Sequence, residues 1–267
     1  FKPSHGTISR QGVLHQSDAL DQVGVFASSI EDAAMLAEIL MSYDPADPAM
    51  RPAARPKLVR IAREEPPLPP RLAFVKTQVW DQAEKETKEA FAELVAFLGD
   101  RVAEVPFYSH FDHAVELHKT ILETDLAVSF ALEYEKGKRK LSLRLRKMIE
   151  SGQRTLAADY VRAVARIPLL NQTIGEIYDR FDAILTPATA GEAPLGLDST
   201  GSPVFCTTWT LIGAPAITLP LLQGANGMPL GVQLVGRKGD DARLLRTARW
   251  LSDLVLQPKK PAKRRRR

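Results

Sequence analysis

Short apolar runs alternate with amphipathic stretches along this chain, and that alternation restricts the fold more than any other feature of the sequence. Residues 72–75, Leu-Ala-Phe-Val, are suited to a buried strand, and residues 101–105 return as a strand by alternation. Between them, residues 82–98 predict a charged helix whose inward face holds Ala83, Phe91, Leu94, Val95 and Leu98. A strand, helix, strand order favours a parallel pair with a crossover helix.

The alternation continues to the C-terminal part of the chain. Further strands are expected at residues 183–185, 216–221 and 230–235, and further helices at 114–134, 155–181 and 241–254. Asn226-Gly227 between the last two strands is a hairpin signal. The sequence therefore predicts an α/β fold, a mixed β-sheet covered by helices on both faces. Only about half a dozen strands are expected, fewer than this much helix would cover, which indicates that part of the sheet is missing.

The connections carry their own signals. Ser29-x-x-Asp32 resembles a capping box and predicts the start of a helix. Residues 44–70 are rich in proline and charge and predict an irregular surface connection. Residues 186–203 predict a loop dense in Gly, Pro, Ser and Thr that follows a strand, a position where loops commonly line binding sites. Residues 204–212 predict a short helix after it, and a basic, glycine-containing link is expected around 136–140.

The sequence pI of 9.2 comes from one end of the chain. Residues 259–267 hold seven cations and no acid, so the remainder has 29 basic and 32 acidic residues, a formal charge of −3. A run of this kind cannot bury apolar area, and residues 257–267 are expected to form a basic, disordered tail. A solvated end is the simpler interpretation of the tail, and contact with nucleic acid or an acidic partner by counterion release is the alternative.

The composition also limits the compartment. There is no unbroken apolar run long enough to cross a bilayer and no signal-peptide pattern at the N-terminus, so no membrane partner is expected. The single cysteine, Cys206, cannot form an internal disulfide or a multi-cysteine zinc site, which agrees with a reducing compartment. We therefore expect a cytoplasmic protein.

No metal or cofactor is expected. His110, Asp112, His113, Glu116 and His118 resemble a metal cluster in sequence, but at helical spacing they do not converge on one point, and a solvated helix face is favoured. Cys206 has no neighbouring signature that would lower its thiol pKa, so it is interpreted as a packing or pocket-lining residue.

Two groups of motifs resemble the amidase-signature family. The first group matches the segment that directly follows the family's nucleophile, and consists of Phe1-Lys2-Pro3-Ser4-His5-Gly6 with Ser9-Arg10 and Gly12, Leu20-Asp21-x-x-Gly24, and Ser29-x-x-Asp32. The second group matches the family's C-terminal signature, and consists of Leu185-Thr186-Pro187, Gly213-x-Pro215-Ala216-Ile217-x-x-Pro220 and Gly231-Val232-Gln233-Leu234-Val235-Gly236. The order of the two groups of motifs and the wide separation between them also match the family, and the resemblance covers residues 1 to about 255.

The resemblance implies a hydrolase or amidotransferase that cleaves carboxamides with a serine nucleophile, a bridging serine and a lysine. A buried lysine whose pKa is depressed can deprotonate a serine hydroxyl, and backbone N–H groups can hold the oxyanion. In the family these residues lie upstream of the Lys2-Pro3 motif, so no catalytic residue is assigned here. The chain is expected to be the C-terminal part of an amidase domain, residues 1–256, which lacks the family's N-terminal portion, is inactive alone and partners an N-terminal amidase segment.

By the same resemblance, the short helix at 204–212 approaches the acyl pocket. The implied contacts to a small-molecule amide substrate are Phe205, Cys206, Thr207 and Trp209, with plain packing as the alternative. Two other functions stay open. One is an A-subunit-like component of a glutaminyl-tRNA amidotransferase, which a stable complex with its partners would indicate. The other is a noncatalytic fragment whose basic tail binds nucleic acid, which salt-sensitive binding lost on deleting residues 259–267 would indicate.

Overall fold

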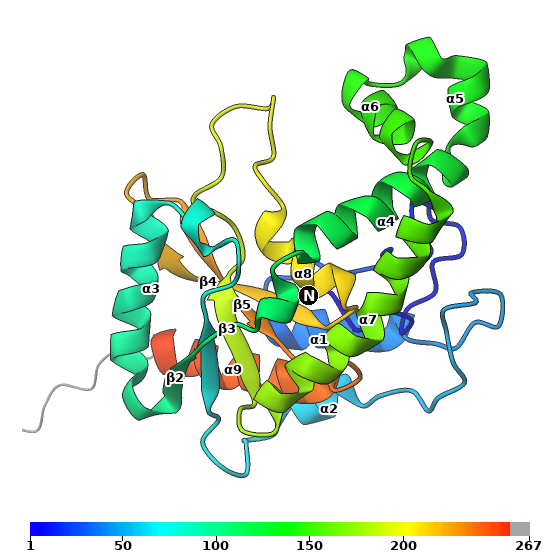
Figure 1. The fold of residues 1–267 in the computed structure, drawn as a ribbon. Helices are drawn as coiled ribbons and strands as arrows, with labels where there is room; N and C mark the ends of the chain where they lie inside the picture. Colours follow the sequence, from blue (N-terminus) through cyan, green and yellow to red (C-terminus); the bar gives the residue numbers. More distant parts are fainter. Residues whose placement is uncertain (257–267) are drawn as a thin grey trace, which may run out of the picture.

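The computed structural model describes residues 1–256, and their centre is a five-stranded mixed sheet (Figure 1). Its strands are β1 (Leu72–Val75), β2 (Val102–Val105), β3 (Ala183–Pro187), β4 (Ala216–Gln223) and β5 (Pro229–Val235). Their order in the sheet is β2-β1-β3-β5-β4. The strands β2, β1 and β3 are parallel, whereas β5 is antiparallel to both β3 and β4. The expected α/β fold with a mixed sheet is confirmed.

The predicted strand, helix, strand unit forms the outer part of the parallel half. The chain leaves β1, runs through α3 (Lys85–Leu98) and returns as β2, with Leu72 opposite Val102. Gly99 follows α3 with φ of +55°, a backbone conformation that glycine adopts without a Cβ penalty. All four residues of β1 are buried, as expected for a strand with a neighbour on each side and helices on both faces.

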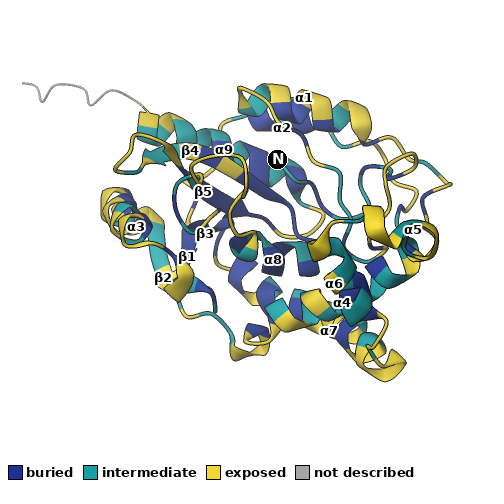
Figure 2. Ribbon diagram, turned by 90° about the horizontal axis from the view of Figure 1, so that it is seen from above, coloured by how far each residue is buried: buried dark blue, intermediate teal, exposed yellow. Residues whose placement is uncertain are grey.

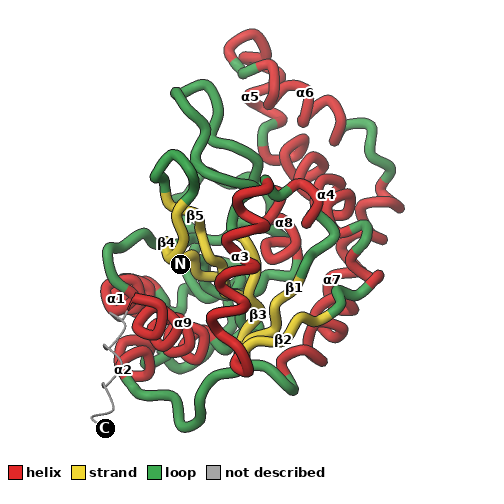
Figure 3. Tube along the Cα trace, turned by 90° about the vertical axis from the view of Figure 1, so that its left-hand side faces the viewer, coloured by secondary structure: helices red, strands yellow, loops and turns green. Residues whose placement is uncertain are grey.

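Each face of the sheet is covered by its own set of helices (Figures 2 and 3). Successive residues of a strand point to opposite faces, so Leu72 and Phe74 face one core while Ala73 and Val75 face the other. The first core is closed by α1 (Ile30–Leu40), α2 (Leu58–Arg63), α3 and α9 (Asp241–Leu256). The second is closed by α4 (Ala114–Ser129), α7 (Ala157–Tyr178) and α8 (Val204–Leu211).

Two further helices, α5 (Ala131–Gly137) and α6 (Leu143–Gly152), project beyond the end of α4 (Figure 1). They share a small core with the end of α4, around Leu126, Phe130 and Ile149. Short 3₁₀ turns lie at Trp80–Gln82, Gly99–Arg101, Ser109–Phe111 and Lys138–Lys140. The sequence pattern missed α6 as well as α2. Residues 44–70 are therefore not irregular throughout, because Leu58 and Ala62, one helical turn apart, bury one face of α2.

One of the two edge strands of the sheet is β4, and its outer edge is only partly paired. Lys2 forms an antiparallel bridge with Ala216, in which each backbone N–H donates to the other residue's carbonyl oxygen at 2.8 Å. Two residues further along β4, the outward N–H and C=O of Thr218 have no hydrogen bond within residues 1–256. Pro220 then has no N–H to offer, as is typical of an edge strand. A stretch of free strand edge therefore begins beside Lys2.

The tail expected at residues 257–267 lies outside the described residues. Within the described part of the chain, every helix is too short or too polar to cross a bilayer.

Candidate functional site

A groove with a volume of about 840 Å³ runs along the free edge of β4. We call it the β4 groove. Its walls are the N-terminal residues Phe1 and Lys2, the segment 24–33 that leads into α1, the edge of β4, and the C-terminal part of α9. Cys206 and Gln233 are the two lining residues that come from α8 and β5. The groove thus brings together both groups of motifs from the sequence.

Lys2 holds the N-terminal segment against the start of β4. Its ammonium group donates to Oε1 of Gln22 at 2.7 Å and to the carbonyl oxygen of Ala214. Burial lowers the pKa of Lys2 to about 7, and the neighbouring Asp241 carboxylate opposes that shift. Lys2 therefore loses its proton more easily than an exposed lysine does, because burial disfavours its charge and its hydrogen-bond acceptors are neutral carbonyl oxygens.

Ser4 and Asp241 clamp the same segment to the start of α9. The backbone N–H of Ser4 donates to Oδ1 of Asp241 at 2.8 Å, and the Ser4 hydroxyl donates to Oδ2 at 2.7 Å. The Ser4 oxygen also accepts from the N–H of Gly239 at 2.8 Å. Burial raises the pKa of Asp241, and the bonds from Ser4 work against that rise. With its hydroxyl committed in this way, Ser4 is a structural residue and not a nucleophile.

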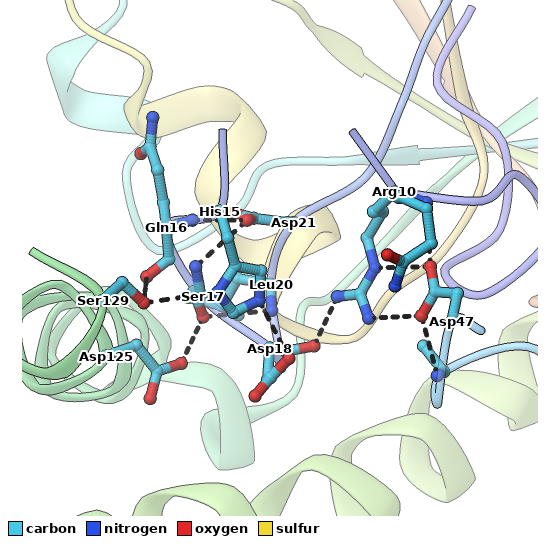
Figure 4. A network of polar contacts seen from close by, with 12 residues as sticks. Arg10, His15, Gln16, Ser17, Asp18, Leu20, Asp21, Asp47, Asp125 and Ser129 are labelled. Atoms are coloured by element: carbon cyan, nitrogen blue, oxygen red, sulfur yellow. Dashed lines mark hydrogen bonds and ion pairs between the residues drawn. The ribbon is translucent and has the colours of Figure 1, made fainter. Parts of the chain in front are cut away.

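A second polar network fixes residues 9–21 on the molecule (Figure 4). Arg10 forms two side-chain hydrogen bonds with the Asp47 carboxylate, Nη2 to Oδ1 at 2.7 Å and Nε to Oδ2 at 2.9 Å, with both side chains buried. The Ser17 hydroxyl donates to the carboxylate of Asp125 on α4. The segment turns at Gly6 and at Gly12, both of which have φ of +80°. These bonds explain why the segment before α1 is ordered although it contains no helix or strand.

One chain of side chains in this region has the composition of a catalytic triad. The Ser129 oxygen lies 3.3 Å from Nδ1 of His15, and Nε2 of His15 lies 2.9 Å from Oδ1 of Asp18 (Figure 4). The Asp18 side chain is 73% exposed, and the Ser129 hydroxyl already donates to the carbonyl oxygen of Gln16. A triad needs a buried, oriented carboxylate and a hydroxyl free to give its proton to histidine. The three residues therefore form a surface hydrogen-bond chain.

The four residues expected to contact substrate lie in different surroundings. Cys206 lines the β4 groove, and burial raises the pKa of its thiol, so it is protonated at neutral pH. Phe205 packs against Val79 and Ala83, and Trp209 is fully buried in the second core. The Thr207 hydroxyl donates to the carbonyl oxygen of Pro203 at 3.2 Å.

Some expectations about the surroundings of the site differ from the structure. The loop that was expected to line a pocket, residues 188–203 in the structure, is absent from the groove lining, and its Glu192 instead accepts hydrogen bonds from Asn226 and Met228 in the β4–β5 turn. His118 is half-buried, not solvated, and burial lowers its pKa to about 4. Within residues 1–256, no three His, Cys, Asp or Glu side chains are placed to hold a metal ion.

Sequence reasoning missed Gln233 as a lining residue of the groove. Its side-chain N–H groups donate to the carbonyl oxygens of Pro187 and Phe205, at 3.2 and 3.3 Å, while Oε1 accepts from the Cys206 thiol. A glutamine in an otherwise apolar strand, Gly231-Val232-Gln233-Leu234-Val235, was the available signal. Gln233 ties α8 to the end of β3 and so positions Cys206 in the groove.

The fold and the groove define a mixed α/β protein with a pocket at a partly paired sheet edge. The family model described as Amidase matches residues 1–245, which is most of the chain. The chain therefore belongs to the amidase family, the one whose signature segments its motifs resemble.

Curated relatives include the A-subunit of the Thermotoga maritima glutamyl-tRNA(Gln) amidotransferase, 27% identical over 93% of this chain and 58% of that protein. The A-subunit of the same enzyme from Roseobacter denitrificans is 28% identical over 98% of this chain and 60% of its own length. The chain thus spans less than two thirds of the length of these relatives.

Solved structures share the fold. A protein from a study of a vestigial complex and the origins of an s-triazine catabolic enzyme superposes with a TM-score of 0.83, at 21% identity, over 94% of this chain and 57% of its own. A crystal structure of an amidase gives 0.77 at 24% identity, with the same coverage of the two chains. The 6-aminohexanoate cyclic dimer hydrolase, solved with substrate, gives 0.78 at 20% identity over 96% of this chain and 60% of that one.

Proposed function

We propose that this chain is the C-terminal part of an amidase domain that hydrolyses a small carboxamide. The supporting observation is the β4 groove, where a free strand edge lies beside the family's own motif at Lys2. In this proposal the serine, bridging serine and lysine of the family come from a polypeptide segment outside residues 1–256. The chain alone is then inactive, since loss of one catalytic group in such a unit typically costs several orders of magnitude in rate.

In this proposal the upstream segment docks along the free edge of β4, and the register of the Lys2–Ala216 bridge supports that position. Lys2 pairs with Ala216 in an antiparallel bridge. If the chain upstream of Lys2 continued as a strand along β4, the next of its residues to direct a backbone N–H and C=O toward β4 would lie opposite Thr218. The free backbone N–H and C=O of Thr218 would form hydrogen bonds with the backbone of that residue. Addition of a strand to an exposed edge is a common mode of peptide recognition, with main-chain hydrogen bonds supplying affinity.

The chemistry assigned to the completed site is acyl transfer. A serine oxygen attacks the carboxamide carbon, the lysine takes the serine proton and passes it to the leaving amine, and water then cleaves the acyl-enzyme. We assign Cys206 a direct contact with the substrate, and Phe205, Thr207 and Trp209 the support of the wall behind it. We place the activity in the cytoplasm, since a single cysteine agrees with a reducing compartment.

The test compares the chain alone with the chain joined to the polypeptide encoded directly before Phe1. Hydrolysis of a panel of aryl and aliphatic amides is followed by release of the amine. Activity only in the joined protein is the expected result. Hydrolysis by residues 1–267 alone would show that the machinery lies within the chain, and a folded but inactive joined protein would overturn the amidase function.

A second candidate is the A-subunit role in a tRNA-dependent amidotransferase, favoured by the names of the curated relatives. In that function, ammonia released from glutamine is delivered to another polypeptide of the complex. The two candidates differ in their dependence on other polypeptides. Co-purification of the joined protein with stoichiometric partners, and glutaminase activity that rises when charged tRNA is added, would replace the small-molecule amidase with the amidotransferase.

A further inference from the structure

The element formed by residues 131–154 stands apart from the sheet and its two cores. It consists of α5, the 3₁₀ turn Lys138–Lys140 and α6, and we call it the basic hairpin. Figures 1 and 3 show it projecting beyond the end of α4, away from the strands. Its apolar side chains, among them Leu145 and Met148, pack with Ile149 against α4. None of the residues that line the β4 groove belongs to it.

The outer surface of the basic hairpin is densely cationic. Residues 136–147 contain seven lysines and arginines and no acid. Lys138 is paired with Glu150 at 2.7 Å, and its ammonium lies 4.6 Å from the centre of the Tyr134 ring. Five more cations are exposed and have no ion pair within residues 1–256, namely Lys136, Arg139, Lys140, Arg144 and Lys147.

The rest of the described chain carries the opposite charge. The basic hairpin contains eight cations and three acids, a formal charge of +5. The remainder of residues 1–256 contains 21 cations and 29 acids, a formal charge of −8. Within residues 1–256, a polyanion is therefore repelled by the body and attracted by the hairpin. Unpaired surface cations on a projecting element also keep their counterions available for release on binding.

We propose that the basic hairpin is a docking surface for the phosphate backbone of a duplex nucleic acid. Its five unpaired cations are long, flexible donors that suit phosphate oxygens. Reading of single-stranded bases would require free aromatic side chains to stack on. Tyr134 is the aromatic residue within the hairpin, and its ring and hydroxyl are both occupied by Lys138 and Glu150. The contact is therefore directed at the backbone and independent of sequence.

An anionic membrane surface is the competing partner, and the packing of the hairpin disfavours it. A helix that lies on a bilayer presents a continuous apolar stripe outward. The apolar stripe of α6 instead faces α4, and the exposed leucines of the hairpin are two separate residues, Leu132 and Leu143, each in the first turn of its own helix. The charge remains accessible while the apolar anchoring is weak, which is the pattern of a backbone-binding surface.

The test uses the full chain and fluorescent duplexes of RNA and of DNA, mixed in sequence and about two helical turns long. Anisotropy titrations at salt concentrations from about 50 to 200 mM give the affinity and its salt slope. The hairpin variant replaces the five unpaired cations by glutamine, as Lys136→Gln, Arg139→Gln, Lys140→Gln, Arg144→Gln and Lys147→Gln. The matched control removes five exposed cations elsewhere, as Arg51→Gln, Arg63→Gln, Lys85→Gln, Arg101→Gln and Arg166→Gln.

We expect the hairpin variant to lose about tenfold or more in affinity at 50 mM salt, with a salt slope smaller by about 3 or more. The control should change affinity by less than about threefold, since the two variants have equal net charge. RNA and DNA duplexes should bind alike. Because residues 259–267 are also basic, both variants are repeated with those seven cations changed to serine.

A charge-conserving variant separates charge from fold. It exchanges lysine and arginine at the same five positions, as Lys136→Arg, Arg139→Lys, Lys140→Arg, Arg144→Lys and Lys147→Arg, and it should bind duplex within about threefold of the unaltered chain. Circular dichroism melting checks that all variants are folded. Equal losses in the hairpin and control variants, binding confined to residues 259–267, or adsorption to phosphatidylserine vesicles without duplex binding would each overturn the proposal.

Discussion

Arg10 and Asp47 connect the N-terminal segment to the turn at residues 44–50, and their removal gives the first prediction. Both side chains are buried, and the guanidinium holds the pKa of Asp47 well below its usual range. Arg10→Ala leaves a buried carboxylate without its partner, which should lower the free energy of unfolding by about 3–5 kcal/mol. Urea unfolding at pH 7 measures this decrease in the free energy of unfolding. Arg60→Ala, which breaks an exposed helical pair with Glu64, should cost about 0.5 kcal/mol or less.

The same ion pair has a pH signature. A carboxyl whose pKa is depressed in the folded state contributes stability above its unfolded pKa, about 3.9, and loses that contribution as the pH falls toward the folded value. The unaltered protein should therefore lose stability steeply below about pH 4, whereas Arg10→Ala should show a shallower acid limb. Parallel acid limbs for the two proteins would mean that Asp47 is not stabilised by Arg10.

Lys2 gives a pH dependence on the alkaline side. Its folded pKa of about 7 lies below the ordinary lysine value of 10.5, so between these values the unfolded chain binds more protons than the folded one. Stability should rise with pH across that window, with a slope of at most about 1.4 kcal/mol per pH unit. Lys2→Met should flatten the rise, and Lys85→Met, at an exposed lysine, should leave it intact. An unchanged slope in Lys2→Met would contradict the assignment.

At the scale of elements, two helical glycines give opposite predictions. A Cβ on Gly152, at the end of α6, would lie 1.8 Å from the backbone oxygen of Glu123 on α4. Gly152→Ala must therefore separate the two helices and should destabilise by about 2 kcal/mol or more, the range of overpacked sites. A Cβ on Gly175, within α7, meets nothing within 4 Å, so Gly175→Ala should stabilise by about 0.5–1 kcal/mol. Thermal melting distinguishes the two signs.

Elements with a strong local signal were predictable from the sequence. The capping box at Ser29 begins α1, with Oγ of Ser29 accepting from the N–H of Asp32 at 3.1 Å. The β4–β5 hairpin at Asn226-Gly227 also formed as expected. The helix α6 was missed because three apolar residues, Leu145, Met148 and Ile149, are its whole inward face among many cations. So few apolar residues stabilise a helix only when another element, here α4, packs over them.

The candidate site was predictable in part. In α8, Phe205 and Trp209 are four residues apart and so share one helix face, which the structure buries. Cys206 lies on another face and reaches the groove. Helical spacing therefore offered a way to separate Cys206 from its two aromatic neighbours, and the resemblance alone treated all of them as pocket contacts. Whether Phe205, Cys206, Thr207 and Trp209 contact a substrate stays a prediction.

At the scale of the whole molecule, the order of the strands in the sheet could not be predicted from local sequence patterns. Parallel β1–β3 pairing joins residues more than a hundred positions apart, and the Lys2–Ala216 bridge spans most of the chain. Such contacts depend on packing of both cores at once, so no window of sequence specifies them. The sequence also predicts missing sheet, from the ratio of strands to helices, and this stays a prediction. In the described sheet, β2 and β4 are the two edge strands, and β4 has a stretch of free edge beyond Lys2.

That edge leads to a prediction about the chain in solution. An unpaired strand edge beside apolar surface is a template for pairing with another chain. We expect residues 1–267 to self-associate as concentration rises, measured by sedimentation velocity. Thr218→Lys adds a charge at the free edge and should shift the protein toward monomer, whereas Gln172→Lys adds the same charge on an exposed position of α7 and should not. A protein that stays monomeric at high concentration, or equal effects of the two lysines, would show that the β4 edge is already protected.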